Sequence, residues 1–178
     1  MCFCGINVIV INLFGGPSSG KTTMAAGLFR LLKTMNKKVE LVQEFAKDLV
    51  WENNLGKLSD QFYVTANQNS KLHNLKSHDL DYVVTDSPIL LGIAYRPDDY
   101  IKSFDNFLLD LYNSYNNFNV LVNRCTKFEE IGRKHNIDES IALDSKIKNI
   151  LDNNNLMYTS VTGNDEGLEK VYNSLIGH

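Results

Sequence analysis

The chain of 178 residues has little cysteine and little histidine. Its three cysteines, Cys2, Cys4 and Cys125, form neither an even set for disulfides nor the four ligands of a structural zinc site. The four histidines show no metal-binding spacing. The sequence therefore excludes a disulfide-rich secreted class and a zinc-finger class, and it predicts a reducing compartment.

Long hydrophobic runs are also missing. The apolar stretch from Met1 to Phe14 is too short to span a membrane, and it lacks the basic n-region and the small-residue cleavage site of a signal peptide. It predicts a buried first strand, so we expect a cytoplasmic protein without membrane contact. No internal repeat divides the chain, and 43% hydrophobic with 22% charged residues is typical of one compact domain over residues 1–178.

An excess of positive charge is the third feature that the sequence lacks. The net charge is -3 and the pI is about 5.8, which argues against a broad basic surface. Any contact with nucleic acid should therefore be local.

Five short apolar segments alternate with amphipathic ones. The expected strands are Ile6–Phe14, Val39–Val42, Tyr82–Thr85, Asn119–Val122 and Met157–Val161. The expected helices are 21–35, 44–52, 59–78 capped by Ser59, 89–95, 104–115, 138–151 and 166–175, with turns at 53–57 and in the Asn-rich stretches 113–119 and 152–155. This alternation predicts an α/β fold with a doubly wound, five-stranded, mostly parallel sheet and helices on both faces.

A phosphate-binding loop follows the first expected strand. The motif G-x-x-x-x-G-K-[ST] is matched by Gly15, Gly16, Pro17, Ser18, Ser19, Gly20, Lys21 and Thr22, with Thr23 continuing into the helix. Glycines let successive N–H groups turn toward phosphate oxygens, and the helix N-terminus adds unpaired donors. Lys21 can reach the β- and γ-phosphates, and the Thr22 hydroxyl can bind Mg²⁺. The motif therefore predicts a site for ATP and Mg²⁺.

Two carboxylates are expected beside this loop. Asp86 follows the third strand directly, an arrangement that holds Mg²⁺ in P-loop proteins, although a helix-capping role is the alternative. Glu44 follows the second strand and can accept a proton from an attacking hydroxyl, or it can simply favour a helix N-terminus. Either carboxylate could be the base or the metal ligand, and the sequence does not separate these roles.

Basic and aromatic residues complete the predicted site. Arg124 and Arg133 bracket a small lid around residues 124–137 and can neutralise charge on a transferred phosphoryl group, although Arg133 could equally be a solvated surface residue. Arg96 could bind a substrate phosphate or lie at the surface. Five aromatic residues fall in segments expected to wall an acceptor site, where they could stack a base or fill the core: Trp51, Phe62, Tyr63, Tyr95 and Tyr100.

The phosphate loop, the stretch 44–52 (EFAKDLVWE), the stretch 84–91 (VTDSPILL) and Gly132-Arg133 together resemble a group of bacteriophage P-loop kinases, the 5-hydroxymethyluridine DNA kinases. The resemblance implies ATP-dependent phosphorylation of the hydroxymethyl group of 5-hydroxymethyluracil in DNA, a step in thymidine hypermodification in the host cytoplasm. By matching position it implies ATP binding at Gly15–Thr23, acidic roles for Glu44 and Asp86, and a lid role for Arg133. The stretch 127–131 (KFEEI) departs from the family's more Pro- and Gly-rich lid.

A DNA substrate must be reconciled with the acidic composition. A local basic stripe could suffice, and the sequence offers Lys47, Lys57, Lys71, Lys76 and Arg96 for it. The first alternative is a kinase of free nucleosides or nucleoside monophosphates, which an acidic pI favours. The second is a regulatory P-loop ATPase or nucleotide switch. A GTPase switch is disfavoured, because residues 86–89 (DSPI) and 123–126 (NRCT) lack the Asp-x-x-Gly and Asn-Lys-x-Asp motifs of GTPases.

Overall fold

The computed structural model describes residues 8–124 and 137–177. Its strands are β1 (Ile9–Phe14), β2 (Val39–Val42), β3 (Tyr82–Thr85), β4 (Asn116–Asn123) and β5 (Thr159–Thr162). Its helices are α1 (Lys21–Thr34), α2 (Phe45–Trp51), α3 (Leu55–Ser59), α4 (Gln61–His73), α5 (Leu91–Tyr95), α6 (Phe104–Asn113), α7 (Ile137–Asn153) and α8 (Asp165–Ile176).

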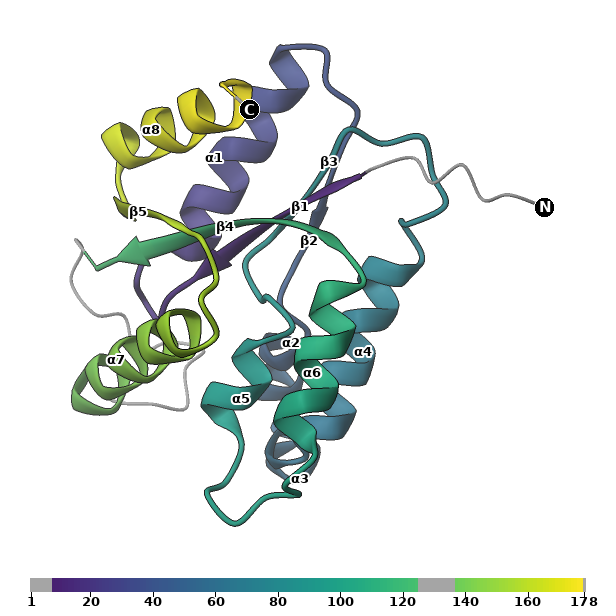
Figure 1. The fold of residues 1–178 in the computed structure, drawn as a ribbon, viewed down its shortest axis with the longest axis vertical. Coiled ribbons are helices and arrows are strands. Elements are labelled where there is room, and N and C mark those ends of the chain that lie inside the picture. The colour runs from purple at the N-terminus through teal and green to yellow at the C-terminus, as the bar shows by residue number, and fades with distance from the viewer. Residues whose placement is uncertain (1–7, 125–136, 178) are drawn as a thin grey trace.

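The strands form one sheet in the order β2-β3-β1-β4-β5, and every neighbouring pair is parallel. The chain starts in the central strand β1, crosses to the edge strand β2, returns through β3, and then passes to β4 and β5 on the other side, which confirms the predicted doubly wound α/β fold (Figure 1). Because all strands run the same way, their carboxyl ends share one edge of the sheet, where ligands bind in this architecture. The phosphate loop, Glu44, Asp86 and Arg124 all follow directly from that edge.

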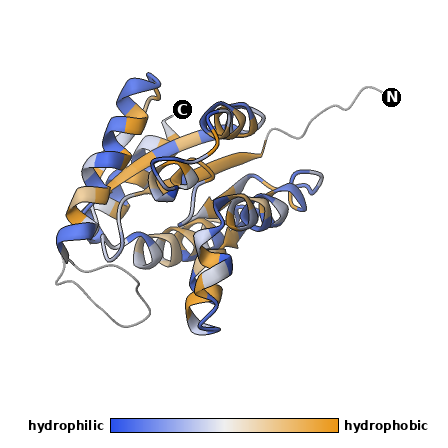
Figure 2. Ribbon diagram, turned by 90° about the horizontal axis from the view of Figure 1, so that it is seen from below, coloured by the Kyte–Doolittle hydropathy of each residue, from blue (hydrophilic) through white to orange (hydrophobic). Residues whose placement is uncertain are grey.

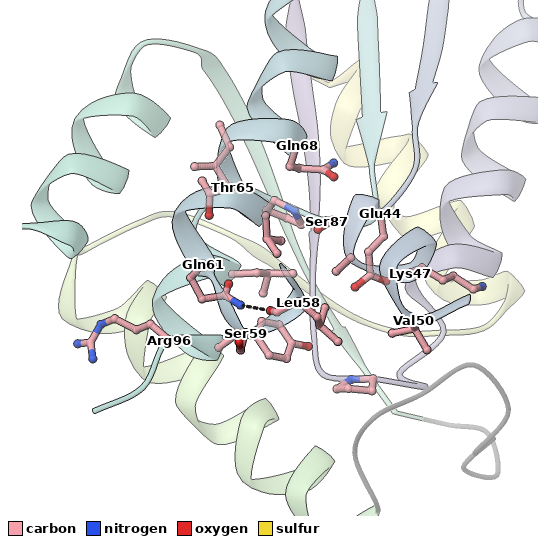
Figure 3. Close-up of a pocket in the computed structure, with 18 of the residues that line it drawn as sticks. Glu44, Lys47, Val50, Leu58, Ser59, Gln61, Thr65, Gln68, Ser87 and Arg96 are labelled. Carbon is pink, nitrogen blue, oxygen red and sulfur yellow. Dashed lines mark hydrogen bonds between the residues drawn. The ribbon is translucent and has the colours of Figure 1, made fainter. Parts of the chain in front are cut away.

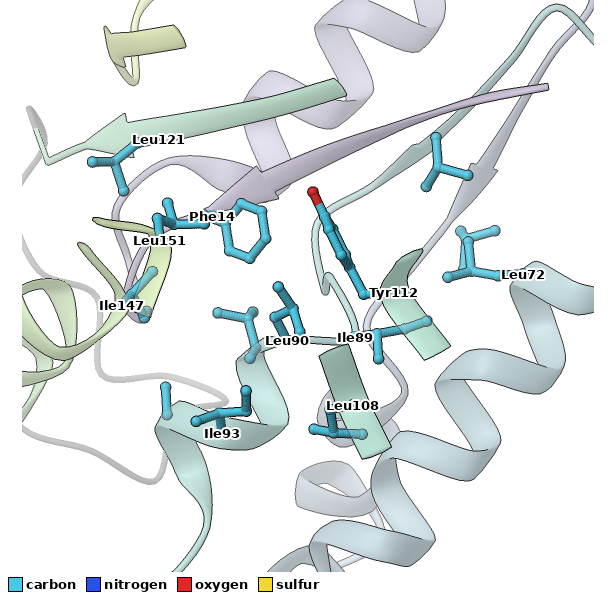
Figure 4. Packing of buried hydrophobic residues seen from close by; sticks show 14 of the residues in the cluster. Phe14, Leu72, Ile89, Leu90, Ile93, Leu108, Tyr112, Leu121, Ile147 and Leu151 are labelled. Carbon is cyan, nitrogen blue, oxygen red and sulfur yellow. The ribbon is translucent and has the colours of Figure 1, made fainter. Parts of the chain in front are cut away.

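Alternate residues of the strands feed two hydrophobic cores, one on each face of the sheet. Ile11 and Leu13 point to the face covered by α1 and α8, together with Leu28 and Val171. Val10 and Phe14 point to the opposite face, where α4, α5, α6 and α7 supply Leu72, Ile93, Leu108 and Ile147 (Figure 4). Figure 2 shows the hydrophobic strands enclosed between these helical layers. Strands buried on both faces explain the near-continuous apolar run of β1.

The segment between α2 and α4 differs from the sequence-based prediction. The turn predicted at residues 53–57 contains the start of α3, whose first turn is capped by the Asn54 side chain accepting from the Lys57 N–H. Asp60, rather than Ser59, caps α4, since its carboxylate accepts from the N–H groups of Phe62 and Tyr63. Ser59 instead donates its hydroxyl to the Gly56 carbonyl, and α4 ends at His73, well before residue 78.

The prediction of a turn over residues 113–119 is wrong, because β4 already begins at Asn116. Amides replace hydrophobic contacts here: Asn12 in β1 donates to the side chains of Asn117 (2.9 Å) and Asn119 (3.3 Å), and Asn119 bonds the Tyr112 hydroxyl. A buried polar ladder therefore extends the strand through a sequence that is otherwise typical of turns.

The ends of the chain show smaller differences. Ile147 and Leu151 of α7 are buried as predicted, whereas Ile141 is half exposed and does not share their face. The last strand begins at Thr159 rather than Met157, which is 89% exposed. Within residues 8–124 and 137–177, no helix has the length and apolar character needed to cross a lipid bilayer.

Candidate active site

The phosphate loop joins the end of β1 to the start of α1 through three residues with positive φ: Gly15 (148°), Ser18 (58°) and Gly20 (100°). A Cβ on Gly15 would lie 2.6 Å from Ser19 Oγ and 2.8 Å from the Val122 carbonyl oxygen. Glycine is therefore required there both by the dihedral angle and by the close approach of β4. Such a loop turns its N–H groups toward one centre, which is the arrangement that binds phosphate.

Lys21 is buried at the base of the loop. Its ammonium group donates to the carbonyl oxygens of Gly15 (2.7 Å) and Gly16 (2.8 Å). These bonds hold the ammonium inside the curve of the loop. Its charge is therefore placed where bound phosphates would lie.

Thr22 and Asp86 meet across the carboxyl ends of β1 and β3. The Thr22 hydroxyl donates to Asp86 Oδ2 at 2.7 Å, and Asp86 is 3% exposed. The other carboxylate oxygen, Oδ1, is buried and has no hydrogen-bond donor among the described residues. A hydroxyl beside an unsatisfied carboxylate oxygen is a hard-oxygen donor set that fits Mg²⁺, which proteins hold through one or two such groups plus substrate phosphates. In residues 8–124 and 137–177 no cluster of three or more His, Cys, Asp or Glu could bind a metal by itself.

A cavity of about 250 Å³ opens beside the loop (Figure 3). Its wall includes Lys21 from the phosphate loop and Glu44 from the N-terminus of α2. The opposite wall comes from α4 and α5, and Ser87 and Pro88 close the side next to Asp86. The structure thus brings Lys21 and Glu44 to one cavity, as the sequence predicted, with Asp86 behind its wall.

One face of α4 presents polar residues to this cavity. Gln61, Thr65 and Gln68 stand at positions i, i+4 and i+7, and each is less than 7% exposed. The Gln68 amide is held in place, since its oxygen accepts from the Phe45 N–H (2.9 Å) and its nitrogen donates to the Thr85 hydroxyl (3.3 Å). Sequence reasoning missed these residues, although polar side chains repeating with helical period on a buried face were a usable signal.

Arg124 lies against the outside of the phosphate loop. Its guanidinium group donates to the Pro17 carbonyl (2.7 Å), the Ser140 hydroxyl (2.6 Å) and Asp144 Oδ2 (2.9 Å). Asp144 Oδ1 in turn accepts from the Gly16 N–H at 2.5 Å. Neither Ser140 nor Asp144 was expected from the sequence, because no local pattern links α7 to a loop more than 120 positions away.

This geometry agrees with the comparison to known families. A family model described as an AAA domain matches residues 10–166. The chain belongs to the AAA domain family. No curated protein matches the sequence. Membership in this family supports a P-loop NTPase fold and binding of a nucleotide such as ATP, with Mg²⁺ as its usual companion.

The remaining predicted residues of this AAA domain fall in different places. Arg133 lies outside the described residues, as does most of the lid predicted at 124–137. Arg96 reaches the cavity wall, but Asp105 binds it through two hydrogen bonds of 2.6 and 2.8 Å. The hydrogen bond to Asp105 raises the pKa of Arg96 above its ordinary value. Arg96 is therefore a charge-neutralised part of the wall.

Of the five aromatic residues considered for the acceptor site, Tyr95 lines the cavity of the AAA domain. Phe62 and Tyr100 instead pack against each other and against Phe104, with ring centroids 4.8 to 5.9 Å apart. Tyr63 packs against Phe45, and Trp51 is 63% exposed on α2. Most of these rings thus serve packing between helices.

Proposed function

We propose that the protein is an ATP-dependent phosphotransferase that phosphorylates a hydroxyl group held in the cavity. The cavity wall contains both Lys21 of the phosphate loop and the Glu44 carboxylate, so a bound hydroxyl would lie between a phosphoryl donor and a proton acceptor. The acceptor oxygen would bond to the γ-phosphorus while the bond from that phosphorus to the β–γ bridging oxygen breaks. ADP would leave, and the hydroxyl proton would pass to Glu44.

The other side chains have supporting roles in this proposal. Thr22 and Asp86 would hold Mg²⁺, which neutralises phosphate charge when bound. The hydrogen bond from Thr22 commits Asp86 to that side of the site, which favours Glu44 over Asp86 as the base. The predicted lid over residues 124–137 would supply Arg133, whose charge would offset that of the transferred phosphoryl group.

We propose 5-hydroxymethyluracil in DNA as the acceptor. This assignment rests on which stretches of the sequence supply the residues of the cavity wall. The two stretches on which the resemblance to 5-hydroxymethyluridine DNA kinases rests, 44–52 and 84–91, contribute Glu44, Ala46, Lys47, Val50, Ser87, Pro88, Ile89 and Leu91 to that wall. The particular part of the resemblance therefore lies at the acceptor cavity, whereas the phosphate loop is common to many NTPases.

The size and polarity of the cavity suit a single base. Its volume of about 250 Å³ is below the 300–1,000 Å³ of sites for drug-sized ligands, and buried amides face it from α4. A base in duplex DNA would have to leave the stack to enter it, as bases do in other enzymes that modify them.

A free nucleoside or nucleoside monophosphate is the second candidate acceptor. It is favoured by the pairing of basic residues that were expected to contact DNA: Arg96 is bound by Asp105, and Lys71 lies 3.5 Å from Asp48. With these two charges offset, the predicted basic stripe attracts a polyanion less strongly.

The deciding experiment supplies γ-labelled ATP with Mg²⁺ and one of three acceptors: DNA containing 5-hydroxymethyluracil, the same DNA with thymine, or free 5-hydroxymethyluridine and its monophosphate. We expect label only on the first. The thymine DNA lacks only the acceptor hydroxyl, so label there would refute transfer to the hydroxymethyl group. Label confined to the free compounds would identify a nucleoside or nucleotide kinase, and phosphate release without a labelled acceptor would identify a regulatory ATPase.

A further inference from the structure

Three polar side chains, two from α7 and one from the end of β4, contact the phosphate loop. Ser140 and Asp144 stand one turn apart on α7, and Arg124 follows the end of β4. Ser140 is fully buried, and the Arg124 and Asp144 side chains are 16% and 31% exposed. We call these three residues the outer clamp, because they bond the phosphate loop from the side on which α7 lies.

The first contact fixes the peptide group between Gly15 and Gly16. Its N–H donates outward to Asp144 Oδ1 at 2.5 Å, and its carbonyl accepts from the Lys21 ammonium at 2.7 Å. In a planar trans peptide these two groups point in opposite directions. This peptide is therefore held from both sides, by α7 outside the loop and by Lys21 inside it.

The second contact fixes the peptide group between Pro17 and Ser18. The Pro17 carbonyl accepts from Arg124 Nη1 and from the Ser140 hydroxyl, both at 2.7 Å. Because no described peptide bond is cis, the Ser18 N–H points opposite to the Pro17 carbonyl, away from Arg124 and Ser140. Ser18 takes a positive φ of 58° in this arrangement, which is unfavourable for a non-glycine residue and must be offset by its surroundings.

Gly16 makes the close approach of α7 possible. A Cβ at this position would lie 2.6 Å from Asp144 Oδ1 and 2.7 Å from the Ser140 carbonyl oxygen. The φ of Gly16 is not in the left-handed region, so the requirement for glycine here comes from α7 alone.

The charges of the outer clamp are balanced. The Asp144 carboxylate next to the loop would repel the phosphates of a nucleotide, and the Arg124 guanidinium 2.9 Å away offsets that charge.

We propose that Asp144, Arg124 and Ser140 are positioning residues that orient the phosphate-loop peptides for nucleotide binding. The inference rests on nucleotide binding by the loop and not on the identity of the acceptor. It assigns Arg124 a role in the nucleotide-free protein, separate from any later contact with the transferred phosphoryl group.

The test is ADP binding with Mg²⁺, measured by isothermal titration calorimetry without any acceptor. Asp144→Ala removes a charge-assisted hydrogen bond, and we expect about 10- to 100-fold weaker binding. Asp152→Asn is the matched control, because Asp152 lies on the same helix and its carboxylate bonds Lys148 and Tyr158 rather than the phosphate loop. It should bind ADP like the native protein.

The effect of charge on ADP binding distinguishes a positioning role from a general effect on stability. Arg124→Gln leaves the Asp144 charge uncompensated beside the loop, so it should weaken ADP binding more than Asp144→Asn does. Combining Arg124→Gln with Asp144→Asn should then recover part of the affinity lost in Arg124→Gln alone. If these residues acted only on stability, the loss of ADP affinity would instead follow the loss of thermal stability in each variant.

Thermal unfolding monitored by circular dichroism establishes that each variant is folded. If Asp144→Ala is unfolded, Asp144→Asn and Ser140→Ala decide the question in its place. Native ADP affinity in folded Asp144→Ala, or in both substitutes, would overturn the proposal. Because no acceptor is present, a wrong assignment of the acceptor leaves this test unaffected.

Discussion

Lys21 is a buried cation whose three donors face two carbonyl oxygens of its own loop. These carbonyl oxygens carry only partial negative charges, whereas phosphate oxygens carry full charges that attract the ammonium more strongly. Phosphate oxygens can complete its coordination. The residue therefore links the shape of the loop to its affinity for anions.

Lys21→Ala should lower the rate of phosphoryl transfer by at least about 10²-fold, since it removes charge stabilisation of the phosphates in the transition state. Lys33→Ala on the same helix is the control, because the Lys33 ammonium is exposed and lies 3.6 Å from Glu40. Turnover measured with labelled ATP should be unchanged in the control. Near-native turnover in folded Lys21→Ala would contradict the assignment of the loop.

Glu44 and Glu52 flank the same short helix, at the N-cap and C-cap positions of α2. Only Glu44 lines the cavity, so Glu44→Gln should lower kcat by about 10²- to 10⁴-fold if its carboxylate accepts the proton. ADP affinity should stay within about twofold, because the change conserves shape and removes only a charge. Glu52→Gln, which is exposed, should retain native kcat and KM. An equal loss of kcat and ADP affinity in Glu44→Gln would instead place Glu44 in nucleotide binding.

The turn between β5 and α8 contacts the phosphate loop directly. The Gly163 N–H donates to the Asn123 carbonyl at 3.0 Å, and a Cβ on Gly163 would lie 2.5 Å from the Ser19 carbonyl oxygen. A backbone atom cannot yield to such a clash as a flexible side chain can. The loop is therefore positioned by β5 as well as by β1.

Gly163→Ala should displace the phosphate loop, costing about 1–3 kcal/mol in unfolding free energy and weakening ADP binding. Gly56→Ala is a matched control on α3, where an added Cβ meets nothing within 4 Å. Alanine is the better helix former, so the control should be more stable by about 0.5–1 kcal/mol. Urea unfolding and ADP titration of the two variants measure both effects. Equal stability of the two variants would contradict the close contact at Gly163.

The amide ladder between β1 and β4 depends on the Tyr112 hydroxyl from α6. Tyr112 is 5% exposed, and burial raises its pKa above the ordinary value of 10.0, although the Asn119 hydrogen bond partly opposes this. A raised folded-state pKa means that the folded protein holds its proton more tightly than the unfolded chain. The stability this contributes is fully present below pH 10 and is lost as pH rises through the folded-state pKa.

Tyr112→Phe should cost about 1–3 kcal/mol at neutral pH, because the Asn119 carboxamide loses its partner in a buried site. The difference in unfolding free energy between this variant and the native protein should become smaller at about pH 11, since the variant has no phenol to ionise at this position. Urea unfolding at both pH values measures the change. Tyr158→Phe, whose hydroxyl bonds the exposed Asp152, is the control and should keep the native pH profile. A constant gap between Tyr112→Phe and native protein would contradict the effect of burial.

The parts of the molecule that local sequence determines were predicted well. The bounds of β2 and β3 follow from their short valine-containing segments, VELV and YVVT, and the positions of Glu44 and Asp86 follow from the shared edge of a parallel sheet. The outer clamp could not be predicted, because Asp144 meets Gly16 only after α7 has docked, 128 positions along the chain. The extent of β4 was missed for a similar reason. Its asparagines favour turns locally, and their partners Asn12 and Tyr112 become neighbours only in the folded sheet.

With a net charge of -3, the protein should contact few phosphates of the proposed DNA substrate, and its affinity for DNA should depend only weakly on salt. Asp105 and Asp48 pair with Arg96 and Lys71, so Lys47 on the cavity wall and Lys57 on α3 are the basic residues best placed to contact a strand. Two phosphate contacts predict a weak salt dependence. Raising salt from about 50 mM to about 200 mM should raise KM for single-stranded 5-hydroxymethyluracil DNA only about sevenfold.

Lys47→Ala combined with Lys57→Ala should nearly abolish that dependence while leaving KM for ATP unchanged, since neither side chain belongs to the phosphate loop. Lys37→Ala combined with Lys38→Ala makes the control, because these residues lie at the amino end of β2, away from the edge that carries the site. In this control, the salt dependence of KM for DNA should match that of the native protein. A loss of more than about 10³-fold between the same salt concentrations would require many more phosphate contacts and would contradict the assignment of two lysines. Salt dependence that persists in the Lys47 and Lys57 double variant would place the strand on another surface.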